Sequence, residues 1–202
     1  MKRSFIASLI SFLVLNSTIS LAETCTYSFD PSQAKITWTA FKTTAKVPVS
    51  GSFKAVVFKG NTQGDSVEKI LSELKVQIDA GSVDSANAGR DLNIVNGFFK
   101  HFKKGMQVSG LFKNIKGYAK EGAFDMALAM NGKVLMVPMT YSATDAHFTA
   151  KGAFDLKTLK LDGALSELNK ICLDLHKGTD GVTKTWSEIL LSVETPVQKK
   201  CL

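Results

Sequence analysis

The chain has 202 residues and a formal net charge of +7 at pH 7. This length suits one domain once the first residues are trimmed. The lysines are spread along the whole chain without a basic run, which indicates a solvated surface and argues against nucleic-acid binding. A mild, transient attraction to a membrane surface with anionic headgroups stays open.

The first 22 residues have the pattern of a secretory signal peptide. Lys2 and Arg3 precede an apolar run, Phe5–Leu15, which is too short to span a membrane as a helix. Small residues then end at Ala22, where we expect cleavage. The mature domain would cover residues 23–202 and lie in the periplasm, with its charge lowered to +5. An uncleaved membrane anchor is the alternative.

Export would place all three cysteines, Cys25, Cys172 and Cys201, in an oxidising compartment. A single disulfide can form in three ways and leaves one thiol over. Cys172 lies in an apolar helical stripe, where a thiol packs as a small hydrophobe, so we expect Cys25–Cys201. The alternative is that the termini fray and the thiols stay free or cross-link chains.

The first predicted strands cover Lys35–Lys42 and Val47–Lys59, because apolar and polar residues alternate in both. Gly51 and Gly60 indicate a bend and a stop in the second strand, since glycine within a strand marks tight curvature. Such long, bent strands are what the closure of a sheet into a barrel requires.

The middle of the chain alternates between helix and strand signals. Asp65, as a cap, and Glu68 predict a short connecting helix. A strand over Leu74–Ala80 follows, then a small, polar hinge at 82–89. Apolar residues at spacings of three or four predict a helix from Leu92 to Phe102.

Four strands joined by tight turns then predict an antiparallel meander. They cover Met106–Ala119, Phe124–Met130, Val134–Ala143 and Phe148–Phe154, and Asn131-Gly132 is the strongest hairpin signal of the chain.

The last elements are a helix over 161–175, with Gly178 as its stop signal, and a strand over Val182–Thr195. The total is about eight antiparallel strands with two or three short helices, which fits a sandwich or a barrel. In a closed barrel the first and last strands are neighbours, so Cys25 and Cys201 would meet. That agreement favours the eight-stranded antiparallel barrel.

Groups that could carry catalysis are sparse. His101, His147 and His176 match no metal-ligand spacing, and no serine elbow or phosphate-binding glycine loop is present. Cys172 has no obvious histidine partner. The pattern therefore argues against an enzyme, and no cofactor is expected.

Large apolar side chains that can face inward are abundant. They fill a core or line a cavity, and the residues alone leave both readings open. The candidates are Phe53, Phe98, Phe99, Phe102, Phe112, Phe124, Met126, Met130, Met136, Phe148 and Phe154. Arg90 with Asp91 either meets a polar headgroup at a barrel mouth or holds the 82–89 hinge, and the second reading is favoured.

Four ordered passages resemble the YceI-like family. They are Ala34–Phe41, Val49–Phe53, Ile78–Phe99 (with Gly89-Arg90-Asp91) and Val137–Tyr141 followed by Phe148–Leu156. The resemblance implies an extended lipocalin-like barrel that sequesters or carries a long-chain isoprenoid, a quinone-like molecule or another amphipathic lipid. The alternative is a structural or stress-related interaction module with a solid core. The oligomeric state stays open, a homodimer included.

The implied ligand-binding residues are most of the inward apolar candidates, together with Trp38 and Arg90. They are Trp38, Phe53, Arg90, Phe98, Phe99, Phe102, Phe112, Met126, Met130, Phe148 and Phe154.

Overall fold

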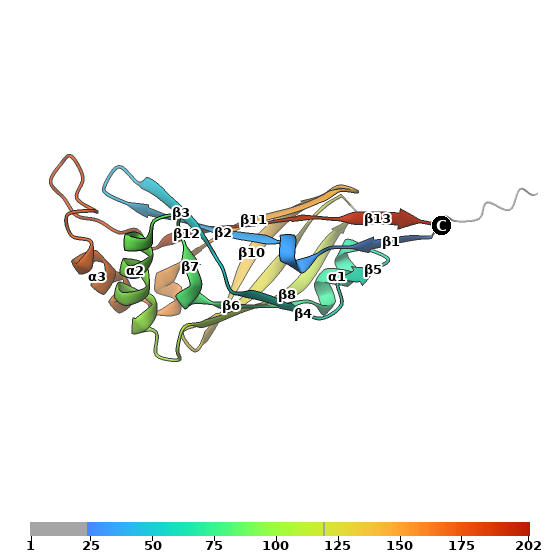
Figure 1. The fold of residues 1–202 in the computed structure, drawn as a ribbon, viewed down its shortest axis with the longest axis horizontal. Coiled ribbons are helices and arrows are strands. Elements are labelled where there is room, and N and C mark those ends of the chain that lie inside the picture. The colour runs from blue at the N-terminus through green and yellow to red at the C-terminus, as the bar shows by residue number, and fades with distance from the viewer. Residues whose placement is uncertain (1–23, 119) are drawn as a thin grey trace, which may run out of the picture.

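The computed structural model of the protein describes residues 24–118 and 120–202. The predicted signal peptide, residues 1–22, lies outside the described residues. The molecule is elongated, with a curled sheet in its middle (Figure 1). Helices α2 (Ala88–Gly97) and α3 (Asp162–Ile171) cover one end, whereas α1 (Val67–Glu73) lies near the other end beside the C-terminus.

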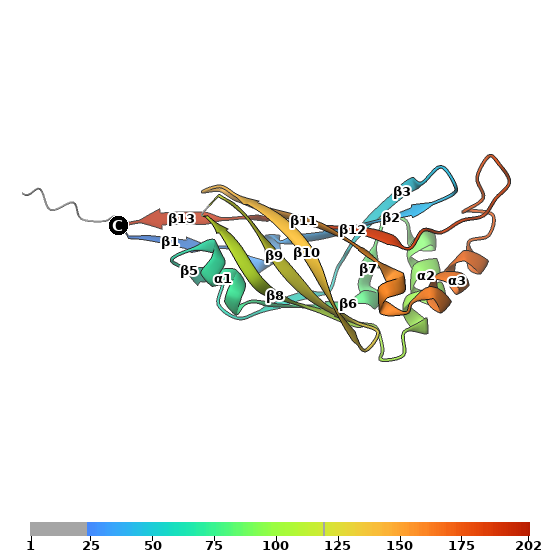
Figure 2. The same ribbon diagram turned by 180° about the vertical axis from the view of Figure 1, so that it is seen from behind.

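Ten of the described strands form the main sheet, in the order β4-β6-β8-β9-β10-β11-β12-β2-β3-β7, and all neighbours are antiparallel. The predicted meander, β8 to β11, forms its long continuous wall (Figure 2). The strands are β2 (Lys35–Lys42), β3 (Val47–Phe53), β4 (Val56–Lys59), β6 (Lys75–Asp79), β7 (Val83–Asp84), β8 (Gln107–Tyr118), β9 (Glu121–Met130), β10 (Lys133–Ala143), β11 (His147–Asp155) and β12 (Glu188–Pro196).

Strands β3 and β4 belong to opposite sides of this order although they are consecutive in the chain, so the sheet curls round on itself. The prediction of one continuous strand over Val47–Lys59 is wrong at Lys54 and Ala55. Their backbone amides donate instead to the carbonyl oxygen and the Oγ of Ser82, both at 2.9 Å. If β3 and β4 are counted as one bent strand and the two-residue β7 is set aside, eight strands surround the interior.

Gly51 does not mark the bend. It lies within β3, where an added Cβ would be 2.5 Å from the indole ring of Trp38 and 2.8 Å from the carbonyl oxygen of Asp84. The close approach of the indole therefore explains this glycine. Gly60 does end β4, with a φ of +116° that side chains disfavour.

The two ends of the described chain are paired. Strands β1 (Cys25–Ser28) and β13 (Gln198–Cys201) are antiparallel, and β5 (Gln63–Gly64) completes a small second sheet. Cys25 lies opposite Cys201, and a disulfide joins them across a sequence separation of 176 residues. The predicted pairing is confirmed, and Cys172 is a buried free thiol. The adjacency of the first and last long strands is also confirmed, because β2 pairs with β12.

The predicted hairpin at Asn131-Gly132 joins β9 to β10, with Met130 opposite Lys133. Both turn residues have a positive φ, 54° and 72°. This is the conformation that a two-residue turn between twisted strands requires.

Several element boundaries differ from the prediction. Ser66, not Asp65, caps α1, since its hydroxyl accepts from the amide of Lys69. Helix α2 starts at Ala88 under an Asn87 cap and ends at Gly97. A separate 3-10 turn, Phe99–His101, follows it, with Phe98 and Phe102 on either side.

The last helix and strand are also shorter than predicted. Helix α3 ends at Ile171, and β12 begins at Glu188 rather than Val182. The backbone between them bonds elsewhere: the amide of Lys184 donates to the carbonyl of His176, and the amide of Trp186 to that of Phe41. Among the described residues no helix has both the length and the apolar character needed to cross a membrane.

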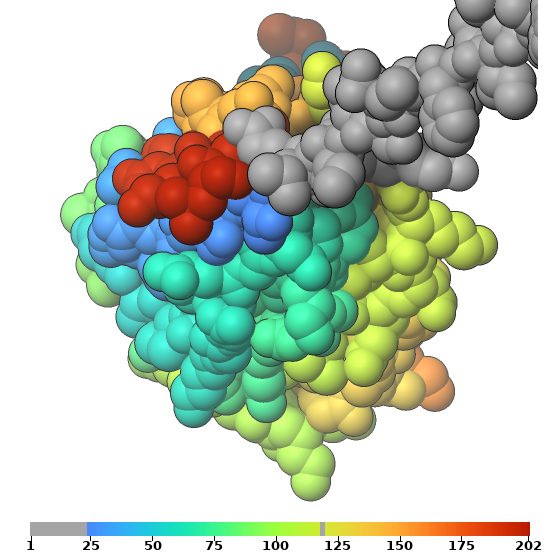
Figure 3. All heavy atoms as spheres, turned by 90° about the vertical axis from the view of Figure 1, so that its right-hand side faces the viewer, coloured from blue at the N-terminus to red at the C-terminus, as the bar shows by residue number. Residues whose placement is uncertain are grey.

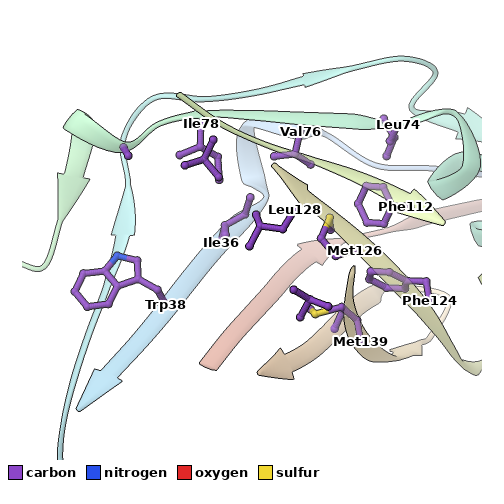
Figure 4. Close-up of a cluster of buried hydrophobic side chains, with 14 of the residues drawn as sticks. Ile36, Trp38, Leu74, Val76, Ile78, Phe112, Phe124, Met126, Leu128 and Met139 are labelled. Atoms are coloured by element: carbon purple, nitrogen blue, oxygen red, sulfur yellow. The ribbon is translucent and has the colours of Figure 1, made fainter. Parts of the chain in front are cut away.

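Side chains on one face of each strand point into a shared interior (Figure 4). The set runs from Trp38 on β2, past Val76 and Leu128, to Phe112 and Phe124. Met136 was expected inside, but it lies on the outer face of β10 and is 44% exposed. Successive side chains of a strand point to opposite faces. The neighbours Leu135 and Val137 point inward, so Met136 points outward.

The interior is filled at the end next to the termini. Helix α1 contributes Val67, Ile70 and Leu71, all buried. Residues of α1 and β5 cover this end of the surface below β1 and β13 (Figure 3). Phe148 stacks on Tyr141 with ring centroids 5.6 Å apart. This packing, which we call the α1 plug, leaves a pocket of about 40 Å³ at that end, whereas the larger unfilled space extends toward α2 and α3.

Candidate ligand-binding cavity

A cavity of about 690 Å³ lies inside the curled sheet and extends to α2 and α3. Sites for small molecules typically measure roughly 300–1,000 Å³ and are mostly apolar. Strands β2, β6, β8, β9 and β12 supply its walls, with side chains such as Ile36, Ile78, Val108 and Leu191. The interior is therefore not a solid core.

Nine of the eleven predicted ligand-binding residues line this cavity. They are Trp38, Phe53, Arg90, Phe98, Phe99, Phe112, Met126, Met130 and Phe154. Their contact with a ligand stays a prediction.

Phe102 and Phe148 do not line the cavity. Phe102 packs edge-on against Phe98 and Phe99, with centroids 5.2 and 5.4 Å apart, and so supports two residues that do line it. Phe148 belongs to the plug near α1, where it stacks on Tyr141. Both were assigned from their apolar character, and alternation along a strand does not tell which end of the interior is filled.

The sequence predicted a mouth near the helix that contains Arg90, but it did not identify several other helical residues that line the cavity. Leu92 and Ile94 of α2, Leu165 and Leu168 of α3, and Trp186 all line the cavity. The helical spacing of the two α3 leucines was visible in the sequence. It identified an apolar face, but the space which that face borders depends on the docking of α3 against α2.

The cavity reaches the surface between α2 and the segment that follows α3. Leu92 and Leu175 both line it, yet they are 62% and 60% exposed. Leu173 and Val182, in the segment after α3, are 55% and 50% exposed. Apolar surface thus continues from the inside of the cavity to its rim at Leu92 and Leu175, which we call the rim leucines.

Arg90 and Asp91 both bind Ser85. The Nε and Nη2 atoms of Arg90 donate to the Oγ and the carbonyl oxygen of Ser85, at 2.8 and 2.6 Å. The carboxylate of Asp91 accepts from the Ser85 amide at 2.9 Å and from its hydroxyl. The reading in which this pair holds the hinge is therefore supported, although the two charges meet through Ser85 rather than directly. Arg90 also borders the cavity.

A group of polar side chains lines the same end. The Nζ of Lys42 donates to the carbonyl oxygen of Leu175 at 3.0 Å. The Nδ1 of His176 lies 2.6 Å from the Oγ1 of Thr185, and that hydroxyl donates to the Oδ1 of Asn169 at 2.8 Å. Burial lowers the pKa of His176, and the charge of Lys42 lowers it further, so the imidazole is neutral near pH 7.

Trp186 also lines the cavity. Its indole Nε1 donates to the carbonyl oxygen of Thr43 at 2.8 Å, and the Nζ of Lys184 lies 3.7 Å from the ring centroid. An aromatic ring with one polar atom and a nearby cation is typical of surfaces that meet both water and lipid. Cys172 also lines the cavity, and burial raises the pKa of its thiol.

Within residues 24–118 and 120–202, no group of three or more His, Cys, Asp or Glu side chains could hold a metal ion. The polar atoms at the cavity are instead suited to hydrogen bonding with a molecule whose larger part is apolar.

A curled antiparallel sheet around an apolar cavity, with helices at its mouth, defines a lipocalin-like fold. The family profile described as YceI-like domain matches residues 27–177. The chain therefore belongs to the YceI-like family. No curated protein matches the sequence.

Solved structures share the fold at low sequence identity. A polyisoprenoid binding domain from Saccharophagus degradans aligns with a TM-score of 0.59 and 11% identity, over 85% of this chain and 97% of that one. BcnA of Burkholderia cenocepacia gives 0.55 and 15%, over 84% and 98%. A YCEI mutant protein of Campylobacter jejuni gives 0.51 and 17%, over 97% and 98%.

Proposed function

We propose that this protein binds a long-chain isoprenoid, quinone-like or other amphipathic lipid in its cavity and sequesters or carries it. The observation that carries the proposal is the apolar cavity of about 690 Å³ with an exposed apolar rim. The fold shared with a polyisoprenoid binding domain supports the choice of ligand class. No reaction is part of the proposal, and the protein acts by binding.

The apolar lining is sufficient to hold a lipid tail. Transfer of each methylene from water to an apolar site contributes about 0.8 kcal/mol. A tail placed along Ile78, Met126 and Leu128 would therefore be held without hydrogen bonds, and the plug at α1 would limit its length. The headgroup would then remain among the polar side chains at the mouth.

The exposed rim gives the lipid a route into the cavity. The rim leucines, Leu92 and Leu175, present apolar surface to solvent at the mouth. Transient contact of this end with a membrane surface would let a tail pass between bilayer and cavity without crossing water.

The proposed place of action is the periplasm. The Cys25–Cys201 disulfide fits an oxidising compartment, and the predicted signal peptide supplies the route. Detection of the mature protein, beginning at Glu23, in the periplasmic fraction would support this. Retention of the intact first residues in the cytoplasm would contradict it.

The alternative, an interaction module without a ligand, predicts an exposed apolar patch on α3 and its following segment. Ile171, Leu173 and Leu175 are indeed 48%, 55% and 60% exposed. However, Leu175 also lines the cavity, so for this residue a cavity mouth explains the exposure as well as a protein partner does.

The deciding experiment is native mass spectrometry of the protein purified from its exporting cells, followed by organic extraction. We expect added mass that matches a lipid in the extract, and one ligand per chain. Protein that carries no lipid, and takes up none from vesicles that contain isoprenoids, would overturn the proposal in favour of the interaction module.

A further inference from the structure

A chain of hydrogen bonds at the cavity mouth fixes the state of one imidazole. Asn169 lies in α3, whereas His176 and Thr185 lie in the segment between α3 and β12. The Oγ1 of Thr185 is 2.8 Å from the Oδ1 of Asn169 and 2.6 Å from the Nδ1 of His176. His176 and Thr185 both border the cavity.

The hydroxyl proton of Thr185 decides which tautomer His176 adopts in this hydrogen-bond network. A threonine hydroxyl has one proton, and that proton goes to the Asn169 amide oxygen, which can only accept. The Thr185 oxygen must then accept from His176, so the proton of the neutral imidazole is on Nδ1. Nε2 is left with a lone pair and no hydrogen-bond partner among the described residues.

The surroundings keep this imidazole neutral. Burial and the nearby ammonium group of Lys42 both disfavour a second proton on the ring. Lys42 donates to the Leu175 carbonyl, and its remaining N–H groups are still available as donors. His176 and Lys42 both border the otherwise apolar cavity, which brings one residue with an acceptor atom and one with donor atoms to its lining.

We propose that the cavity selects lipids whose headgroup carries a hydroxyl group, because a hydroxyl can donate to Nε2 of His176 and accept from Lys42. This inference rests on the proposed lipid-binding function and narrows its ligand class to long-chain alcohols and phenols. An ether of the same chain can only accept, so it leaves the lone pair of Nε2 unsatisfied. A carboxylate is likewise an acceptor only.

Thr185 is a positioning residue in this scheme. It does not need to touch the lipid, since its role is to accept from Nδ1 and so to direct the acceptor atom Nε2 to the ligand. Removal of its hydroxyl would free the imidazole to adopt either tautomer.

The first test compares ligands with one tail and three headgroups: a long-chain prenol, its methyl ether and the corresponding carboxylate. Affinities are measured with the disulfide-bonded protein by competition against a fluorescent lipid. We expect the alcohol to bind about three- to tenfold more tightly than the ether, the range that one net hydrogen bond gives. Equal affinity of alcohol and ether, or tightest binding of the carboxylate, would overturn the inference.

Matched variants separate recognition from packing. His176→Phe keeps an aromatic ring but removes the acceptor, so alcohol and ether should bind equally. Thr185→Val should reduce the preference for the alcohol, whereas Thr185→Ser should keep it. A preference that survives in His176→Phe would overturn the inference.

The tautomer itself can be read without a ligand. Long-range ¹H–¹⁵N NMR spectra of protein with labelled histidine distinguish a proton on Nδ1 from one on Nε2. We expect the Nδ1-protonated form for His176, and the Nε2-protonated form would overturn the inference. The results also distinguish the two proposals. If none of the three ligands binds, lipid binding itself is contradicted. If all three bind equally, only the preference for a hydroxyl headgroup is contradicted.

Discussion

The hydroxyl group of Tyr141 donates a 2.7 Å hydrogen bond to the carboxylate of Glu68. The bond joins β10 of the sheet to α1, and it closes the filled end of the interior. Burial raises the pKa of the Tyr141 phenol, and the bond to Glu68 raises it further, so the phenol remains the donor throughout the physiological pH range.

Replacement of this phenol tests the attachment of α1. Tyr141→Phe should lower the free energy of unfolding by about 1–3 kcal/mol, because Glu68 loses its partner in a partly buried place. Urea denaturation measures the loss. Glu68→Gln keeps an acceptor oxygen and should cost less, so equal losses in the two variants would contradict this account.

The terminal disulfide should matter for stability but not for binding. Cys25→Ser with Cys201→Ser should lower the free energy of unfolding by about 2–4 kcal/mol, since the unfolded chain gains freedom. Lipid uptake at low temperature should be unchanged, because the cavity mouth lies at the other end of the molecule (Figure 1). Thiol titration of the denatured wild-type protein should find one free thiol, that of Cys172. Three reactive thiols would contradict the pairing.

Two glycines should respond oppositely to alanine. In Gly51→Ala the new Cβ would be 2.5 Å from the Trp38 ring and 2.8 Å from backbone oxygen, so we expect a loss of about 1–3 kcal/mol from overpacking. Gly163, in α3, has no neighbouring atom within 4 Å of an added Cβ. Gly163→Ala should stabilise the helix by about 0.5–1 kcal/mol. Thermal denaturation compares them, and a neutral Gly51→Ala would show that Trp38 is not held by this contact.

A filled cavity should not bind lipid. Ala40 lines the cavity from β2, and Ala40→Trp would place an indole inside it. We expect lipid affinity to fall about tenfold or more, with the free energy of unfolding within about 2 kcal/mol of wild type. Thr37→Trp, on the same strand but absent from the lining, is the matched control and should bind normally. Normal binding by Ala40→Trp would place the ligand elsewhere.

His176 should make stability depend on pH. Its pKa in the folded protein is lowered below the ordinary value of 6.5, so as pH falls the unfolded chain takes up this proton first. The stabilising contribution is therefore complete above 6.5 and is lost as pH falls toward the folded pKa. Urea denaturation between about pH 7 and pH 5 should give a steeper loss for wild type than for His176→Gln. The difference between the two slopes is the measurement, since carboxylates titrate in both proteins. Equal slopes would contradict the neutral, buried imidazole.

Much of the fold could be predicted because its signals are local. Alternation along β9 and β10 and the Asn131-Gly132 turn fix a hairpin within a few residues of chain. The Cys25–Cys201 pair followed from closure of the sheet, because closure brings the first and last strands together. The break at Lys54 and Ala55, by contrast, depends on hydrogen bonds to Ser82, which is distant in the sequence. The local alternation of residues therefore could not predict this boundary.

Alternation along the chain identifies the apolar face of most strands, since that property repeats every two residues. Strand β10 is an exception, because its outer face carries the apolar Val134 and Met136. Where the interior is filled and where it is hollow depends instead on how elements far apart in the chain pack together. The volume near Phe148 is taken up by α1, whereas the volume near Trp38 is left open by the way α2 and α3 dock. A cavity forms only where elements that are distant in the sequence pack around it. The same packing brings Lys42 close to His176 and Thr185 in the cavity lining.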